Sequence, residues 1–346
     1  MATDREKFAP EELALCLNRY DLGEIRSIRE FVRGSPAAPK VLIECERGRF
    51  MFKRRPRGRD QREHVLFAHR LQLFLGERGF PLPHLVATRD RFESMLIVDG
   101  AIYELFQFIE GGDYDRSGAA TAAAGAALGT FHRLTECYAS PKAPIDWHYH
   151  DRPAVRGAIA ESVKTLGAAG NGDVDARTAQ VKQLQGLYRR CAAHADELGL
   201  RRWPPQIIHG DWHPGNMLFD EGGVAAVMDY DSARLAPRVL DIANGALQFS
   251  IQAGSDDPRQ WPSELDLPRL GEFLRGYRST GRALAAAEGQ ALPHLMCEAM
   301  IAEAVGPIAV TGTFGRLEGF PFLQMIARKA HWILEHVKEL AEAMGT

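Results

Sequence analysis

The segment 207–219 reads IIHGDWHPGNMLF, and the segment 227–231 that soon follows reads VMDYD. In each, apolar residues typical of a short strand lead into a polar loop, so that Asp211, Asn216 and Asp229 stand near strand ends. Carboxylate and amide oxygens are hard ligands that suit Mg²⁺, and a hydroxyl that attacks a phosphate needs a proton acceptor and a cation beside the phosphates. The two segments therefore predict a site for phosphate chemistry, in which Asp211 orients or deprotonates a hydroxyl while Asn216 and Asp229 hold metal. The alternative is a β-hairpin whose polar turns are merely solvated.

The bulk composition is that of a globular protein and limits its partners. With 346 residues, of which 45% are hydrophobic and 25% charged, the chain has room for two structural lobes. Its 42 Lys and Arg nearly balance 45 Asp and Glu, which gives no net drive towards nucleic acid or an anionic membrane. Five scattered cysteines without a C-x-x-C pair indicate neither a zinc ribbon nor a disulfide framework. Because the charged N-terminus leads into no apolar run, and no stretch approaches the roughly 20 apolar residues of a membrane span, we expect a cytoplasmic protein without a membrane or nucleic-acid partner.

The first 110 residues change between strand and helix patterns. Short segments rich in branched or aromatic residues, separated by turns that contain Gly or Pro, are typical of antiparallel strands. Two other segments carry apolar residues at helical spacing. The predicted order is a helix at 10–20, strands at 25–32, 41–45 and 50–53, a helix at 59–78, and strands at 85–88, 94–98 and 101–109.

After a glycine pair at 111–112 the chain becomes mostly helical. Outside the strand pair of the opening segments, helices are expected at 119–134, 174–198, 268–277, 292–305 and 322–344, with a loop at 139–153. The predicted fold is therefore α+β, with an N-terminal lobe at 1–110 and a C-terminal lobe at 111–346.

The sequence HGDWHPGN at 209–216, followed by MDYD at 228–231, resembles the catalytic and metal motifs of the aminoglycoside phosphotransferase and homoserine-kinase-like family, relatives of the protein kinases. The spacing of five from Asp211 to Asn216 also matches the protein-kinase catalytic loop. The order of elements extends the resemblance over about residues 25–245. It implies a bilobal protein-kinase-like fold, in which the N-terminal antiparallel sheet and helix bind nucleotide and the larger, mostly helical C-terminal lobe carries catalysis and binds the substrate. It further implies Asp211 as catalytic base, Asn216 and Asp229 as Mg²⁺ ligands, and ATP bound between the lobes.

Four further residues near these motifs have more than one interpretation. By the resemblance, His209 is a structural member of the catalytic loop, and a buried ring fits as well as a chemical role. His213 stands where common protein kinases carry a lysine, so it contacts the γ-phosphate or the acceptor, or else only packs. Asp231 is a second metal or substrate ligand, or a turn cap. Asp241 resembles the acid that braces the catalytic loop from the following helix, or is a plain helix cap.

In the N-terminal lobe the resemblance implies a phosphate clamp. Lys53 resembles the strand lysine that pairs with the α- and β-phosphates, although a lysine that ends a strand is by itself more often a solvated charge. Glu63 on the following helix would hold this lysine in place, because such a clamp must be preorganised. Glu77 lies on the same predicted helix and is the alternative partner.

Three other segments complete the comparison with the family. By the resemblance, the backbone of Gln107 and Ile109 in the predicted hinge meets the edge of the adenine. The turn at 33–39 has one glycine and two prolines where protein kinases have a glycine-rich loop, so fewer backbone amides converge on a phosphate. The run HYHD at 148–151 has no partner cysteines and no H-E-x-x-H helix. We expect an exposed loop there, with substrate contact as the functional alternative.

These motifs predict an ATP-dependent phosphotransferase, with GTP as a possible donor and Mg²⁺ as cofactor, that acts on a hydroxyl of a small metabolite of the amino alcohol, amino acid or sugar type. A bacterial-type serine/threonine protein kinase of the same fold is the alternative. A polycationic aminoglycoside would favour a strongly acidic pocket, whereas the C-terminal helices mix acidic and basic residues. A non-catalytic nucleotide-binding module is less favoured because all four key residues are present: Lys53, Asp211, Asn216 and Asp229. A metal-dependent phosphoesterase would need further metal ligands, and a P-loop kinase would need G-x-x-x-x-G-K-[ST], which is absent.

Overall fold

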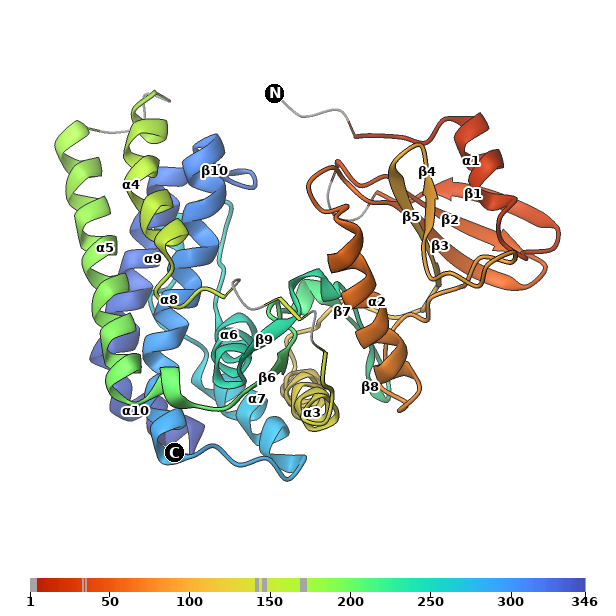
Figure 1. The fold of residues 1–346 in the computed structure, drawn as a ribbon. Coiled ribbons are helices and arrows are strands. Elements are labelled where there is room, and N and C mark those ends of the chain that lie inside the picture. Colours follow the sequence, from red (N-terminus) through yellow and green to blue (C-terminus); the bar gives the residue numbers. More distant parts are fainter. Residues whose placement is uncertain are drawn as a thin grey trace. The chain divides into compact units, whose positions relative to one another are not determined.

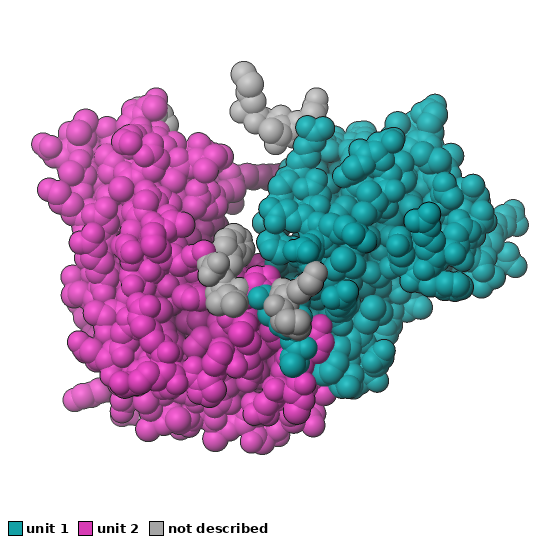
Figure 2. Space-filling model, in the orientation of Figure 1, with its two compact units in different colours: residues 1–113, 139–143, 217–231 teal, residues 114–138, 144–216, 232–346 magenta. Residues whose placement is uncertain are grey.

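The structure is a computed structural model that describes residues 5–32, 34, 36–140, 143–144, 148–168 and 173–345. The chain divides into two compact units, coloured separately in Figure 2. Unit 1 comprises Met1–Asp113, Ala139–Ala143 and Met217–Asp231, and unit 2 comprises Tyr114–Tyr138, Pro144–Asn216 and Ser232–Thr346. The two segments quoted first from the sequence are therefore divided between the units, because the chain passes from unit 2 into unit 1 after Asn216.

Unit 1 contains an antiparallel five-stranded sheet with the strand order β1-β2-β3-β5-β4 (Figure 1). The alternation typical of such strands is plain in β2, where buried and half-buried residues follow one another. The buried face packs with residues of helix α1 around Phe52, whose ring stacks on that of Tyr103 at a centroid distance of 5.7 Å. The elements are α1 (Pro10–Leu17), β1 (Ile25–Glu30), β2 (Lys40–Cys45), β3 (Gly48–Arg54), α2 (Arg62–Gly76), β4 (Leu96–Val98) and β5 (Ala101–Gln107).

A hairpin of two short strands, β7 (Met217–Asp220) and β8 (Gly223–Val227), also belongs to unit 1. The N–H of Gly112 donates to the carbonyl of Phe219 at 2.7 Å, and the N–H of Phe219 donates back at 3.0 Å. A Cβ at the neighbouring Gly111 would lie 2.8 Å from that of Leu218, so this close approach needs glycine. These contacts fix the hairpin, and with it the strand end that carries the MDYD segment, to the rest of unit 1.

Unit 2 is mostly helical, and helices α4, α5, α8 and α9 lie side by side in it (Figure 1). Two further helices, α3 and α7, approach each other so closely that side chains are excluded between them. A Cβ on Gly125 would lie 1.9 Å from the carbonyl oxygen of Phe273, and a Cβ on Gly276 would lie 1.9 Å from that of Ala122. The helices are α3 (Gly118–Thr135), α4 (Pro153–Ala168), α5 (Val174–Glu197), α6 (Val239–Ser250), α7 (Leu267–Ser279), α8 (Ala286–Thr311), α9 (Gly319–Glu335) and α10 (Val337–Met344), and the strand pairs are β6 (Pro205–Ile208) with β9 (Arg234–Pro237) and β10 (Thr313–Phe314) with β11 (Leu317–Glu318).

Helix α8 corrects two expectations from the sequence. It runs without a break through Pro293 and Pro307, which usually mark helix boundaries, and is therefore longer than the predicted 292–305. Among the described helices it alone has the length and composition of a membrane span, although the sequence was expected to contain no such stretch. Of its most apolar window, 56% is buried inside the protein, as in the central helix of a helical core.

Three other element predictions differ from the structure. Helix α4 was not predicted at all. The segment 85–88 forms only a bridge between Leu85 and Phe106 rather than a strand. The predicted helix 322–344 is divided into α9 and α10, because the backbone leaves helical geometry at His336, where φ is −111° and ψ is 27°.

Candidate active site

The segment 209–216 follows β6 in unit 2, and its backbone is held from helix α6. The carboxylate of Asp241 accepts the N–H of His209 at 2.6 Å and that of Gly210 at 2.7 Å. Gly210 has a φ of 78°, and a Cβ there would lie 2.4 Å from the carbonyl oxygen of Ser232, so the bend needs glycine. Two charge-assisted hydrogen bonds thus fix the start of the loop.

Asp241 is itself buried and hydrogen-bonded to a histidine. Its Oδ2 lies 3.2 Å from Nε2 of His132, whose Nδ1 lies 3.0 Å from the hydroxyl of Tyr277. Burial opposes ionisation of Asp241, but the hydrogen bond from His132 and the N–H of Gly210 outweigh it, and its pKa lies below the ordinary value. Burial lowers the pKa of His132, so this ring is neutral near pH 7 and donates from Nε2. Asp241 is therefore an ionised brace inside unit 2.

Asp211 is held through its neighbours in the same loop. The amide Nδ2 of Asn216 donates to Oδ2 of Asp211 at 2.9 Å and to its backbone carbonyl at 3.1 Å. Nε2 of His213 lies 3.5 Å from the same Oδ2, while Nδ1 of this ring accepts the N–H of Gly215 at 3.0 Å. Because Nδ1 is an acceptor, a neutral His213 carries its proton on Nε2, which faces Asp211. The structure therefore brings Asp211, His213 and Asn216 together.

The side chain of Asp211 remains 42% exposed, so a substrate can reach it. Partial burial raises its pKa, but His213, His209 and Asn216 lower it more, and the resulting pKa lies below the ordinary value. Asp211 is thus ionised at neutral pH and accepts hydrogen bonds. Such a group orients a hydroxyl and can take its proton late in a transfer, when the hydroxyl has become acidic. By contrast, the ring of His209 is fully buried against Trp212, at a centroid distance of 5.3 Å.

In unit 1, the end of the β7–β8 hairpin holds Asp229 in an unusual backbone conformation. Asp229 has a φ of 63°, which places a residue with a Cβ in the left-handed region. Such a conformation costs of order 1–3 kcal/mol and tends to occur where function requires it. Asp229 is exposed, whereas two residues later Asp231 is held by Arg55 through both carboxylate oxygens, at 2.9 and 2.8 Å. Asp229 is therefore exposed to solvent, whereas both carboxylate oxygens of Asp231 are already bound by Arg55.

The structure gives Lys53 a different partner from the predicted Glu63. Nζ of Lys53 lies 3.1 Å from Oε2 of Glu104, which is fully buried, whereas Glu63 is exposed in the first turn of α2. The register explains the change, because Lys53 of β3 and Glu104 of β5 are direct cross-strand partners. Glu104 was missed, although a lone carboxylate inside the apolar strand AIYELFQ is a signal of a buried ion pair. Glu77, the alternative, is the C-cap residue of α2.

The predicted hinge and the turn at 33–39 give less evidence about nucleotide binding. The N–H of Gln107 donates to the carbonyl of His84 at 2.8 Å, so this donor is already used within unit 1 and adenine contact through it is not supported. Ile109 follows the end of β5 and is half-buried. Of the turn at 33–39, residues 33 and 35 lie outside the described part.

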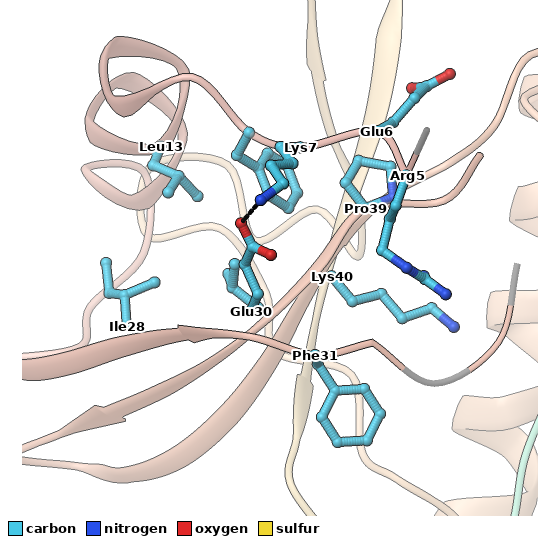
Figure 3. A pocket seen from close by; sticks show the side chains of 11 residues that line it. Arg5, Glu6, Lys7, Leu13, Ile28, Glu30, Phe31, Pro39 and Lys40 are labelled. Atoms are coloured by element: carbon cyan, nitrogen blue, oxygen red, sulfur yellow. Dashed lines mark ion pairs between the residues drawn. The ribbon is translucent and has the colours of Figure 1, made fainter. Parts of the chain in front are cut away.

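A separate pocket in unit 1 lies between the N-terminal segment and strands β1 and β2 (Figure 3). Lys7 and Glu30 in its wall form an ion pair at 2.9 Å. None of the predicted site residues lines this pocket, so it is distinct from the predicted catalytic machinery.

The HYHD segment is not the exposed loop that the sequence predicted. His150 is buried, with Nδ1 at 3.0 Å from Glu298 and Nε2 at 3.2 Å from Asp196. Its neighbour Tyr149 donates from its hydroxyl to the carbonyl of Leu240 at 2.9 Å. Both ring nitrogens of His150 are thus engaged with carboxylates, which makes the segment part of the framework of unit 2.

The donor set fits Mg²⁺ by its chemistry. Because Nδ2 of Asn216 faces Asp211, its Oδ1 is the atom suited to a cation, and within unit 1 the exposed carboxylate of Asp229 is a second hard oxygen ligand. Within the described residues, no three His, Cys, Asp or Glu side chains converge on a possible metal position. A full protein cage is not required, since Mg²⁺ is usually held by one or two side chains together with substrate phosphates and water.

Comparison with known proteins gives a family match over most of the chain. The family model described as phosphotransferase enzyme family matches residues 27–288. The chain is 26% identical to a homoserine kinase of Phenylobacterium zucineum (strain HLK1) over 293 residues, which cover 82% of this chain and 80% of that protein.

Solved structures confirm the predicted fold class, with an N-terminal antiparallel sheet and helix followed by a mostly helical part. An aminoglycoside phosphotransferase from Alicyclobacillus acidocaldarius matches with a TM-score of 0.69 at 13% identity, over 99% of this chain and 98% of that one. A microcompartment-associated aminopropanol kinase matches with a TM-score of 0.68 at 17% identity, over 94% and 97% of the chains. The amicoumacin kinase hAmiN, in complex with AMP-PNP, Ca²⁺ and its substrate, matches with a TM-score of 0.66 at 15% identity, over 94% of each chain. At these identities the likeness establishes the fold alone.

Proposed function

The chain belongs to the phosphotransferase enzyme family, and from this premise we propose that it moves the γ-phosphate of ATP to a hydroxyl of a small metabolite of the amino alcohol, amino acid or sugar type, with an amine-bearing alcohol as the preferred acceptor. The observation that carries the proposal is the environment of Asp211. Its carboxylate is ionised and accessible, and it is held by Asn216 and His213 in a loop whose backbone Asp241 fixes.

In the proposed reaction, a carboxylate oxygen of Asp211 accepts a hydrogen bond from the acceptor hydroxyl. The hydroxyl oxygen forms a bond to the γ-phosphorus as the bond from that phosphorus to the bridging oxygen of ADP breaks. The proton of the hydroxyl passes to Asp211, and the electron pair of the broken bond remains on ADP. His213, which faces Asp211 through Nε2, helps to keep the carboxylate ionised until the transfer is under way.

We propose that the donor nucleotide is held mainly through its phosphates. Lys53, fixed by Glu104, supplies a positive charge for the phosphates. Oδ1 of Asn216 and the carboxylate of Asp229 would hold Mg²⁺, which when bound neutralises phosphate charge. The proposal includes GTP as donor, because Lys53, Asn216 and Asp229 are proposed to act on the phosphates and the metal, which ATP and GTP share.

The preference for an amine rests on the surface near Asp211. Glu303 of α8 is exposed on the surface of unit 2 and accepts a hydrogen bond from Gln248 of α6. Partial burial and the nearby charge of Asp211 raise the pKa of Glu303 above its ordinary value, although His213 and Gln248 lower it. Helix α6 is tied to the same loop, since Asn244, one turn before Gln248, lies 3.5 Å from the carbonyl of Trp212. Two carboxylates on one accessible surface favour a cationic ligand. The names of the homoserine kinase and aminopropanol kinase point to the same kind of acceptor.

The test is a screen for ADP release with Mg-ATP and a panel of amino alcohols, hydroxy amino acids, neutral sugars and a protein acceptor. We expect turnover with a primary or secondary alcohol that carries an ammonium group. In parallel, Mg-ATP at about 100 times its dissociation constant should stabilise the fold by about 2.7 kcal/mol. Turnover with a protein acceptor alone would replace the small-molecule proposal with protein phosphorylation. The absence of both nucleotide binding and ADP release would reject phosphoryl transfer.

A further inference from the structure

The most concentrated buried charge among the described residues of unit 1 surrounds Glu104. This carboxylate is fully buried on β5, yet it contacts Nη2 of Arg55 at 2.8 Å, Nζ of Lys53 at 3.1 Å and Nε2 of His69 from α2. Nδ1 of His69 lies 2.8 Å from the hydroxyl of Ser94, so the ring is held at both nitrogens. Burial alone would raise the pKa of Glu104, but these neighbours lower it far below the ordinary value. Glu104 therefore stays ionised and connects three separate elements of the unit.

Arg55 extends this network to the MDYD segment. Its side chain is only 4% exposed, and its two terminal nitrogens bind the two oxygens of Asp231 at 2.9 and 2.8 Å, the parallel arrangement that is strongest for an arginine and a carboxylate. Nη1 also donates to the carbonyl of Arg59 at 3.1 Å. Arg55 thus spans 176 residues of sequence, from the end of β3 to the end of the β7–β8 hairpin.

The two acids of this network are each paired with basic side chains. Arg55 and Lys53 supply two positive charges, and Glu104 and Asp231 supply two negative ones. Both oxygens of Asp231 already face a guanidinium group, so a cation at the same oxygens would have to displace Arg55 or lie beside its charge.

Resting on the proposed function, we infer that Asp231 is a positioning residue rather than a metal ligand, and that Arg55 and Glu104 join it to Lys53 as one rigid charge network. The network holds the strained residue Asp229, two positions before Asp231, in register with the phosphate lysine. It also anchors Lys53 across the sheet, from β5. A bidentate pair suits this task because it fixes orientation as well as distance.

The experiment compares four variants for turnover with Mg-ATP and for the Mg²⁺ dependence of AMP-PNP binding, measured by calorimetry. Arg55→Met and Asp231→Asn should each lower kcat by about 10–100-fold, as loss of a supporting residue does, while the half-saturating Mg²⁺ concentration for AMP-PNP binding rises much less than in Asp229→Asn. Asp229→Asn should instead raise that Mg²⁺ concentration by about 10–100-fold. The matched control is Arg54→Met, which removes the same charge from the adjacent residue of β3, where Arg54 pairs with Glu6 and Glu12 instead. Its kcat should remain that of the wild type.

Two outcomes would overturn the inference. Asp231→Asn could shift the Mg²⁺ dependence as far as Asp229→Asn, which would make Asp231 a ligand, or Arg55→Met could match Arg54→Met in kcat. If Arg55→Met does not fold, Arg55→Lys keeps the charge but loses the bidentate geometry and should show the same loss of kcat, with a Mg²⁺ dependence shifted much less than in Asp229→Asn. The double variant Arg55→Met with Asp231→Asn should be no slower than the slower single variant, because both substitutions break one contact. A wild-type protein that binds no nucleotide would reject the proposed function itself, which separates the two failures.

Discussion

Asp211 of the HGDWHPGN segment and Asp231 of the MDYD segment are both ionised acids, but their surroundings differ. Asp211 is 42% exposed and is held by an amide and a histidine, which leave it accessible to a substrate. Asp231 is 22% exposed and both of its oxygens are bound by Arg55. In each case the pKa is lowered against the effect of burial. A lowered pKa therefore does not identify a catalytic acid, whereas the identity of the partner separates a group that receives substrate from one that supports the fold.

The largest expected effect is that of replacing Asp211, the more accessible of the two acids. Asp211→Asn keeps the size of the side chain but removes the proton acceptor, so kcat should fall by about 10²–10⁴-fold. The affinity for AMP-PNP, measured by calorimetry, should change little because the proposed phosphate and metal contacts remain. A kcat within a factor of a few of the wild type would exclude Asp211 as the base.

The next effect concerns the brace of the catalytic loop. Asp241→Ala removes a charged acceptor from the buried N–H groups of His209 and Gly210, each worth about 1.5–3 kcal/mol, so the free energy of unfolding should fall by about 3–6 kcal/mol. Urea unfolding measures this loss. Asp241→Asn is the isosteric control, which retains one acceptor oxygen and should lose less.

The same brace has a predictable pH dependence. The pKa of Asp241 is lowered in the folded state, so its contribution to stability is fully present above the unfolded value of about 3.9 and is lost as pH falls through the folded pKa. In Asp241→Ala this part of the acid dependence should disappear. An equally steep loss of stability below pH 4 in wild type and variant would show that other carboxylates account for it.

Sequence reasoning located the catalytic loop but not the groups that support it. Asp211 and Asn216 are five residues apart, so a local pattern contains them both. Arg55 and Glu104 are brought together by strand pairing, and Arg55 reaches Asp231 across 176 positions, which no local period encodes. Glu104 was missed as a partner of Lys53 for this reason, because the helix after a strand is visible in the sequence whereas the cross-strand register is not.

The secondary-structure predictions likewise succeeded where the pattern is local and failed where tertiary contacts decide. Strand alternation in 41–45 and the helical spacing in 174–198 were sufficient to predict β2 and α5 within one residue at each end. Helix α8 was truncated because its two prolines lie inside it. The HYHD segment was predicted to be exposed on its polarity alone, yet His150 is buried through tertiary partners in α5 and α8, and the other three residues are half-buried.

A smaller effect tests the strain at the exposed acid of unit 1. Asp229→Gly and Asp229→Ala both remove the carboxylate, but only glycine adopts a φ of 63° without steric cost. The glycine variant should therefore be more stable than the alanine variant by about 1 kcal/mol in urea unfolding. Equal stabilities would show that the backbone at this position relaxes, and that the strain is not maintained by its surroundings.

The smallest effect separates the two carboxylates considered for Lys53. Glu63 is exposed, so Glu63→Gln should change the affinity for Mg-AMP-PNP by no more than about twofold, the equivalent of about 0.5 kcal/mol for a surface substitution. Glu104→Gln removes the charge that lies 3.1 Å from Nζ of Lys53 and should weaken binding clearly more, because a lysine without its fixed partner must be ordered by the ligand itself. The reverse order of effects would mean that Lys53 exchanges Glu104 for Glu63 when nucleotide binds, and would restore a role for helix α2 in the phosphate clamp.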